Sequence, residues 1–234
     1  MNIRVLLDEC RVMILAMMPE IIERRFQIEY KPDGSPVTEA DRFIEGRLQA
    51  FLQYRLSGLF FVGEESYDFQ AAGQAGYFVL LDPIDGTENF CSGLKEWGVS
   101  LGIWKDGVHQ GSLLMLPELG EHIMTGDASP RLHSRITGFS SSYHDAIASG
   151  IREAVEYRVT GCAVYNLFNV ITGGFARFIN PKGAYAWDLL PGVMLALEHG
   201  CSVKVDDAEY HGQFLEPDRK YRVDIRHRHD LHSG

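Results

Sequence analysis

Cysteine is scarce in this 234-residue sequence and never occurs in closely spaced pairs. The four cysteines, Cys10, Cys91, Cys162 and Cys201, are far apart, and none belongs to a C-x-x-C motif. This spacing argues against both a zinc knuckle and a disulfide framework. We therefore expect reduced thiols and a cytoplasmic location.

The sequence also lacks an excess of basic residues and a long apolar run. It has 22 Lys and Arg against 32 Asp and Glu, so neither a nucleic-acid nor a membrane partner is expected. The apolar stretch VMILAMMPEII follows Asp8 and Glu9 and is interrupted by Pro19, which argues against a signal peptide and a membrane span. Its apolar residues recur every three or four positions, which predicts an amphipathic helix that is kinked or restarted at Pro19.

What remains is ordinary globular composition, with 45% hydrophobic and 23% charged residues. The first part of the chain combines helical patterns with short strands that suggest an antiparallel meander. After the loop from Ser129 to Ser134, strand-like and helix-like segments alternate. We therefore predict an N-terminal α+β half over residues 1–131 and a C-terminal α/β half over residues 132–234.

Acidic residues stand where predicted elements begin or end. Glu64 follows the apolar run LFFVG, and Asp82 and Asp85 lie in DPIDG after YFVLL. Asp41 stands at a predicted helix start in VTEAD, and Asp188 stands at another in AWDLLPG. Taken singly, each position is typical of a cap, a turn or a solvated surface. Together, they offer hard oxygen ligands without His or Cys, a set that favours Mg²⁺, Mn²⁺ or Ca²⁺ over zinc.

The turn DPIDGT supports the same interpretation. A proline-fixed bend can direct Asp82 and Asp85 toward one point and expose the Ile84 carbonyl as a further ligand. Gly86 and Thr87 come next, where unpaired N–H groups at the start of a helix would accept a phosphate oxygen.

The motifs DPIDGTENF, GEE, VTEAD and GCA…WD…G resemble, in order and spacing, the inositol monophosphatase family of metal-dependent, typically lithium-sensitive phosphatases. The resemblance covers residues 31–200. It implies a layered α/β/α/β/α sandwich with the active site between the two halves. It also implies two or three Mg²⁺ ions, with Mn²⁺ as an alternative.

The resemblance assigns metal ligands residue by residue. Glu64, Asp82 and the Ile84 carbonyl would hold a first ion, while Asp82, Asp85 and Asp188 would hold a second. Glu64 would also help to hold a weaker third ion.

The resemblance further assigns catalysis to Asp41, Thr87 and Glu64. Thr87 would orient the attacking water, and Asp41 would accept the hydrogen bond of the threonine hydroxyl. Family members that act on inositol phosphate commonly carry a glutamate where this chain has Pro181. The neighbouring side chains of Lys182 and Tyr185 are therefore candidates to contact the substrate in place of that glutamate. The predicted substrate contacts are Asp85, Gly86, Thr87, Gly161, Ala163, Lys182 and Tyr185.

These features predict a Mg²⁺-dependent phosphatase that hydrolyses an inositol, sugar or polyol phosphate through a metal-activated water. The resemblance also implies a homodimer. Alternative substrates are a 3′(2′),5′-bisphosphate nucleotide, fructose 1,6-bisphosphate and histidinol phosphate. A weakly active binding or regulatory relative is the alternative of a different class. The C-terminal histidines, His227, His229 and His232, are expected to lie in a frayed, solvated end.

Overall fold

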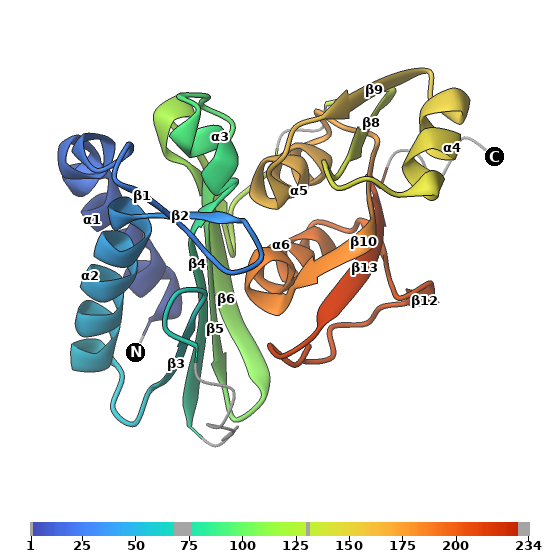
Figure 1. Cartoon of the computed structure of the whole chain (residues 1–234). Coiled ribbons are helices and arrows are strands. Elements are labelled where there is room, and N and C mark those ends of the chain that lie inside the picture. The colour runs from blue at the N-terminus through green and yellow to red at the C-terminus, as the bar shows by residue number, and fades with distance from the viewer. Residues whose placement is uncertain (1, 68–75, 130–131, 229–234) are drawn as a thin grey trace.

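The computed structural model describes residues 2–67, 76–129 and 132–228, which form two larger β-sheets and their flanking helices (Figure 1). The helices are α1 (Ile3–Glu23), α2 (Glu39–Arg55), α3 (Thr87–Cys91), α4 (Asp145–Glu153), α5 (Ala163–Thr172) and α6 (Ala186–Glu198), with a 3-10 turn η1 (Pro117–Leu119). The strands are β1 (Ile28–Tyr30), β2 (Pro36–Thr38), β3 (Phe60–Gly63), β4 (Tyr77–Asp85), β5 (Gly98–Lys105), β6 (Val108–Leu116), β7 (Glu121–Met124), β8 (Ile136–Phe139), β9 (Glu156–Val159), β10 (Arg177–Tyr185), β11 (Ser202–Val205), β12 (Ala208–Glu209) and β13 (Lys220–Arg226).

Helices and sheets alternate in five layers. α1 and α2 pack against the outer face of a five-stranded sheet with the order β3-β4-β5-β6-β7. α5 and α6 lie between this sheet and a six-stranded sheet with the order β12-β11-β13-β10-β8-β9, while α4 packs on the latter (Figure 1). The predicted α/β/α/β/α layering is therefore confirmed. The division into two halves stays a prediction, and its boundary at residue 131 lies outside the described residues.

The central position of β4 explains its sequence. It pairs in parallel with β3 and antiparallel with β5, and α2 and α6 cover its two faces. A strand buried on both faces has a continuous apolar run such as YFVLL. Beyond it, β5, β6 and β7 form the expected antiparallel meander. Because β3 and β4 run in the same direction, their acidic C-terminal ends lie side by side.

The C-terminal part of the described chain is not frayed, and that expectation is wrong. β13 pairs on both sides, with β10 and β11. His227 follows directly, is 3% exposed, and places its Nδ1 atom 2.8 Å from the Val170 carbonyl oxygen. Tyr221, Val223 and Ile225 alternate with charged residues along β13, which is the period-two sequence pattern of a half-buried strand, and their side chains are buried. His229 and His232 lie outside the described residues.

The first helix also differs from expectation. α1 continues through Pro19 to Glu23 as one helix, so the predicted restart does not occur. Its buried residues recur at helical spacing and pack on the five-stranded sheet, as expected of an amphipathic helix. None of the helices within the described ranges has the length and apolar composition needed to cross a membrane. All four cysteines are free thiols.

Candidate metal and phosphate site

One side of the site forms where β3 and β4 end. Gly63 of β3 pairs with Leu81 of β4, and the next residue, Glu64, donates its N–H to the Leu81 carbonyl at 3.1 Å. The register with β5 shifts after Asp82, whose Oδ1 accepts the N–H of Ile84 at 3.0 Å. The bend at Pro83 therefore holds the Asp82 side chain in a fixed orientation, with 1% exposure.

The next carboxylate comes from α6, on the other side of the site. Asp188 is the third residue of α6, and its Oδ2 accepts the N–H of Tyr185 at 2.9 Å in a capping box. One oxygen from each of Glu64, Asp82 and Asp188 lies within 4.8 Å of the others. Three of the predicted metal ligands thus converge from segments that are distant in the sequence.

Burial and crowding disfavour the ionised form of these carboxyl groups. Desolvation raises the pKa of Asp82 well above its ordinary value, and the charges of Glu64 and Asp188 raise it further. The pKa of Asp188 is raised in the same way, by desolvation and then by the charges of Glu64 and Asp85. A divalent cation would offset this repulsion, and Mg²⁺ and Mn²⁺ prefer oxygen ligands. The residues present therefore fit the predicted ions.

Asp85 lies beside this cluster and is held by the start of α5. Its Oδ2 accepts the thiol hydrogen of Cys162 at 2.8 Å and also the N–H of Val164. Burial raises the pKa of Asp85 to about 6, although these hydrogen bonds act in the opposite direction. Its charge is close enough to raise the pKa of Asp188. Its place in a second metal site stays a prediction.

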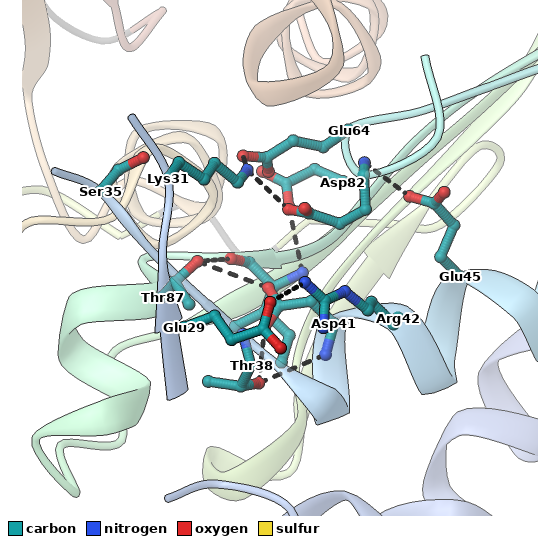
Figure 2. Close-up of polar contacts among 12 residues, drawn as sticks. Glu29, Lys31, Ser35, Thr38, Asp41, Arg42, Glu45, Glu64, Asp82 and Thr87 are labelled. Atoms are coloured by element: carbon teal, nitrogen blue, oxygen red, sulfur yellow. Dashed lines mark hydrogen bonds and ion pairs between the residues drawn. The ribbon is translucent and has the colours of Figure 1, made fainter. Parts of the chain in front are cut away.

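A second polar network surrounds Thr87 (Figure 2). Asp41 Oδ2 accepts the Thr38 N–H at 2.8 Å and the Thr38 hydroxyl at 2.5 Å, which closes the expected capping box at the start of α2. The Thr87 hydroxyl lies 2.9 Å from the Ile84 carbonyl and 3.5 Å from Asp41 Oδ1. Since a hydroxyl has one proton, Ile84 is its main acceptor and Asp41 a weak one. Burial raises the pKa of Asp41 to about 7.

The chain turns between β4 and α3 at Gly86. This residue has a φ of 81°, which favours glycine. A Cβ at this position would lie 2.9 Å from the Cβ of Cys162, so glycine also allows the turn to approach α5 closely. The N–H groups of Gly86 and Thr87 stand at the start of the short helix α3, and phosphate binding there stays a prediction.

The sequence patterns missed a layer of charged residues behind the cluster. Lys31 Nζ contacts Glu64 at 2.9 Å and Glu65 at 2.7 Å, and Glu45 accepts the N–H of Glu65 at 3.0 Å (Figure 2). Glu45 could have been found, because it follows Asp41 by one helical turn and shares its face. Lys31 reaches the site only because the β1–β2 hairpin folds back, which no local pattern reveals.

A cavity of about 230 Å³ opens beside the carboxylates, between the start of α5, β10 and the segment that follows β8. Its lining includes Asp85 and Asp188 from the acidic cluster. It also includes Gly161 and Ala163, which were predicted to contact the alcohol portion of the substrate. The cavity therefore joins the predicted metal site to the predicted substrate site.

The other four predicted substrate contacts, Gly86, Thr87, Lys182 and Tyr185, do not belong to the described lining of this cavity. Lys182 is exposed to solvent, and the Tyr185 ring stacks on Trp187 with 4.6 Å between ring centroids. Lys220 and Ser140 line the cavity, and the sequence analysis did not single them out. Their proximity depends on the pairing of β10 with β13 and β8, which is a long-range contact.

A larger cavity of about 320 Å³ lies beside α4 and is lined mainly by β10, β11 and β13. None of the predicted site residues lines it within the described ranges. Two of its charged residues already pair with each other, because Arg177 donates to both oxygens of Asp224 at 2.7 and 2.6 Å. The candidate site is therefore the smaller cavity beside the acidic cluster.

Comparison with known proteins identifies the family of the chain. A model of the inositol monophosphatase family matches residues 4–129, more than half of the chain. The histidinol-phosphatase of Chlorobaculum parvum is 36% identical over 100 residues, which are 42% of this chain and 37% of that protein. The 3′-phosphoadenosine 5′-phosphate phosphatase of Mycobacterium leprae is 25% identical over 199 residues, which are 75% of this chain and 73% of that protein. The chain spans little more than a third of the length of the histidinol-phosphatase that it matches.

The fold is also shared with solved structures. A crystal structure of an IMPase/NADP phosphatase complexed with Mg²⁺ and phosphate superposes with a TM-score of 0.80 at 20% sequence identity. The superposition covers 98% of this chain and 93% of that chain. At this low identity, the likeness supports the fold alone.

Proposed function

Since the chain belongs to the inositol monophosphatase family, we propose that it is a Mg²⁺-dependent phosphatase that hydrolyses a small phosphate monoester. The observation that carries this proposal is the convergence of oxygens from Glu64, Asp82 and Asp188 within 4.8 Å. Buried carboxylates so close together repel one another unless cations neutralise them. Inhibition by lithium is part of the proposal.

The proposed ligands divide between two ions. Glu64, Asp82 and the Ile84 carbonyl would hold one ion, and Asp82, Asp85 and Asp188 would hold the other. When bound, such ions neutralise the phosphate ester and lower the pKa of a bound water. Lys31 contacts Glu64 at 2.9 Å and therefore competes with a cation for this carboxylate. The first ion and the weaker third ion both depend on Glu64, so both would have to displace this contact.

Thr87 and Asp41 would orient the attacking water. The Thr87 hydroxyl has two acceptors within reach, Ile84 at 2.9 Å and Asp41 at 3.5 Å. Donation to Asp41 leaves the Ile84 carbonyl available as a ligand and the Thr87 oxygen free to accept a hydrogen bond from water. The N–H groups of Gly86 and Thr87 would donate to the phosphate oxygens.

The alcohol portion of the substrate has several candidates. Inositol, sugar and polyol phosphates remain the first class, with histidinol phosphate, a bisphosphate nucleotide and fructose 1,6-bisphosphate as alternatives. The similarity to a histidinol-phosphatase and to a 3′-phosphoadenosine 5′-phosphate phosphatase supports the histidinol and nucleotide alternatives. A binding or regulatory subunit is the alternative outside catalysis. The presence of a carboxylate at each of the predicted side-chain ligands, Glu64, Asp82, Asp85 and Asp188, argues against it.

Phosphate release from a panel of small esters tests the proposal. We expect Mg²⁺-dependent release that lithium inhibits, with turnover lost in Asp82→Asn. The panel should be repeated with Mn²⁺, and calorimetry should report Mg²⁺ binding independently of turnover. A folded wild-type protein that binds Mg²⁺ but cleaves none of the esters would support the regulatory alternative instead.

We further propose that two copies of the chain associate through β9. β9 is an edge strand that pairs only with β8 among the described residues, and all of its residues are exposed. Antiparallel pairing of two β9 strands about Tyr157 would place each Glu156 opposite the Arg158 of the second copy. Val155 and Val159, which are 65% and 49% exposed, would then also meet across the two-fold axis. A cytoplasmic location stays a prediction.

Light scattering tests this dimer. Wild-type protein should be dimeric, Arg158→Glu should dissociate it, and Glu156→Arg combined with Arg158→Glu should restore association. Wild-type protein that stays monomeric at micromolar concentration, or variants that all stay dimeric, would reject β9 as the interface.

A further inference from the structure

The cavity beside the acidic cluster has an unusual balance of charge. In its described lining, the carboxylates are Asp85 and Asp188, and both are proposed to hold cations. The other polar residues of the lining include Ser140, Asn180 and Lys220, called the polar wall below, and none of these three carries a negative charge. Once cations neutralise the carboxylates, this wall presents hydrogen-bond donors and one positive charge to a substrate.

Lys220 supplies that charge from a defined position. It is the first residue of β13 and pairs in register with Tyr185, the residue that caps α6. Asp188 lies three residues later on α6, so the β10–β13 pairing fixes the Lys220 backbone relative to a proposed metal ligand. The Lys220 ammonium lies 4.9 Å from the centre of the Tyr185 ring, which is a cation–π distance.

Lys220 also differs from its neighbours in its ion pairs. Arg219 contacts Asp206 at 2.9 Å, and Arg222 contacts Asp207 at 2.9 Å. Lys220 makes no ion pair with a carboxylate in the part of the chain that the structure describes. Its positive charge is therefore not neutralised by a carboxylate, and Lys220 belongs to the lining of the cavity.

Two further side chains on this wall have unused hydrogen-bonding capacity. The Ser140 hydroxyl is buried and has no hydrogen-bond partner among the described residues. A buried hydroxyl without a partner lowers the stability of the folded protein unless a ligand or a water molecule forms a hydrogen bond with it. Asn180 is 5% exposed and uses its Oδ1 to accept the N–H of Gly183 at 3.0 Å, which leaves its Nδ2 hydrogens to donate.

We propose that the substrate carries a second anionic group on its alcohol portion, either a carboxylate or a second phosphate, which Lys220, Ser140 and Asn180 bind. This inference rests on the proposed phosphatase function and narrows its substrate class. It disfavours an alcohol portion with a cationic amine, such as histidinol, because the amine would face the Lys220 ammonium. The cavity volume of about 230 Å³ limits the alcohol portion to a small molecule.

A set of small esters tests the charge preference, with glycerol 3-phosphate and 3-phosphoglycerate as the pair that matches in size. Glycerol 3-phosphate has a neutral alcohol portion, 3-phosphoglycerate adds a carboxylate, fructose 1,6-bisphosphate adds a phosphate, and phosphoethanolamine and histidinol phosphate add an amine. We expect kcat/KM to be highest for one of the two esters with a second anion. Lys220→Gln should lower this value about 10- to 100-fold, as expected for loss of a charge-assisted hydrogen bond. The value for glycerol 3-phosphate should change less than threefold.

Two lysine variants serve as comparisons. Lys105→Gln removes the same charge at an exposed position on the five-stranded sheet. It should leave kcat/KM unchanged for every ester. Lys182→Gln tests the lysine that the sequence favoured. A loss of the anionic preference in Lys182→Gln but not in Lys220→Gln would overturn the assignment. Ser140→Ala should lower kcat/KM for the same esters as Lys220→Gln, but by a smaller factor.

A binding measurement separates this inference from the phosphatase proposal. Phosphonate analogues of glycerol 3-phosphate and 3-phosphoglycerate can be titrated calorimetrically in the presence of Ca²⁺. Tighter binding of the carboxylated analogue, lost in Lys220→Gln, supports the subsite even if no ester is hydrolysed. Efficient hydrolysis with equal preference for neutral and anionic esters would overturn the subsite and leave the phosphatase proposal intact.

Discussion

Asp82 and Lys220 belong to the two sheets that flank the site, and their surroundings are opposite. Asp82 is 1% exposed on β4, and the negative charges of Glu64, Asp188, Asp85 and Asp41 act on it. Lys220 is exposed on β13, and its ammonium lies 4.9 Å from the centre of the Tyr185 ring. The β4 side therefore needs cations, whereas the β13 side offers a cation.

This difference suggests that the β4 side carries out the hydrolysis and that the β13 side selects the substrate. Changes on the β4 side act on groups that every phosphate ester would share, so they should lower the turnover of all esters alike. Changes on the β13 side act on the alcohol portion, so they should alter the ranking of esters. Each prediction below tests whether the two sides can be separated in this way.

The largest effect is expected for Asp82→Asn. Loss of a shared metal ligand should lower kcat/KM about 10³-fold or more for every ester, since metal stabilisation amounts to several kcal/mol. The metal-free variant should also melt at a higher temperature than metal-free wild type, because one buried carboxylate is removed from a repelling cluster. Kinetics and calorimetric melting measure the two effects.

Asp206→Asn provides the matched control for this variant. Asp206 is a partly exposed carboxylate in the turn between β11 and β12, where it contacts Arg219 and Arg222, and its φ of 49° also suits asparagine. Its replacement should change stability by less than about 1 kcal/mol and leave turnover unchanged. If Asp82→Asn altered the ranking of esters and spared the rate for some of them, the separation of the two sides would fail.

A smaller effect is expected for Thr87→Ala. Removal of the hydroxyl that would orient the water should lower kcat about 10²-fold, the lower range for positioned proton-transfer groups. The Mg²⁺ dissociation constant should stay within a factor of about three, because the Ile84 carbonyl is a backbone group that the substitution retains. Thr87→Ser should recover most of the rate. A loss of Mg²⁺ affinity in Thr87→Ala would instead assign the hydroxyl to the metal site.

The β4 side could be predicted from the sequence because its signals are local. Asp41 follows Thr38 in a capping-box pattern, Asp82 ends a buried apolar run before a proline bend, and Asp188 begins a helix. Each position is fixed by the element that contains it. The resemblance to the motifs of a known family then predicted the role of each of these residues, and it also predicted the layered fold.

The β13 side could not be predicted because its contacts depend on strand pairing across long separations. Lys220 faces the site only through the register of β13 with β10, and Ser140 only through the end of β8. Sequence proximity to Asp188 instead favoured Lys182, which lies in an irregular part of β10 and is exposed. Lys31 was missed for the same reason, since a hairpin brings it to Glu64.

The smallest effect separates the two sides without a mutation. Asp85 and Asp41 have an ordinary pKa of 3.8, and burial raises the pKa to about 6 and about 7, respectively. Between these values the folded protein retains protons that the unfolded chain has released. Their contribution to the stability of the metal-free protein is therefore complete below about pH 4 and is lost as the pH rises toward 7.

In EDTA, the melting temperature should consequently fall by roughly 4–9 °C from pH 5 to pH 6, because the two groups together lose about 2 kcal/mol over this range, at about 2–4 °C for each kcal/mol. Saturating Mg²⁺ should reduce the fall, because cations stabilise the ionised carboxylates. Asp85→Asn should remove part of the fall in EDTA, whereas Lys220→Gln should not change it. Equal slopes with and without Mg²⁺ would mean that the titrating groups lie away from the acidic cluster, and the contrast between the two sides would lose its electrostatic basis.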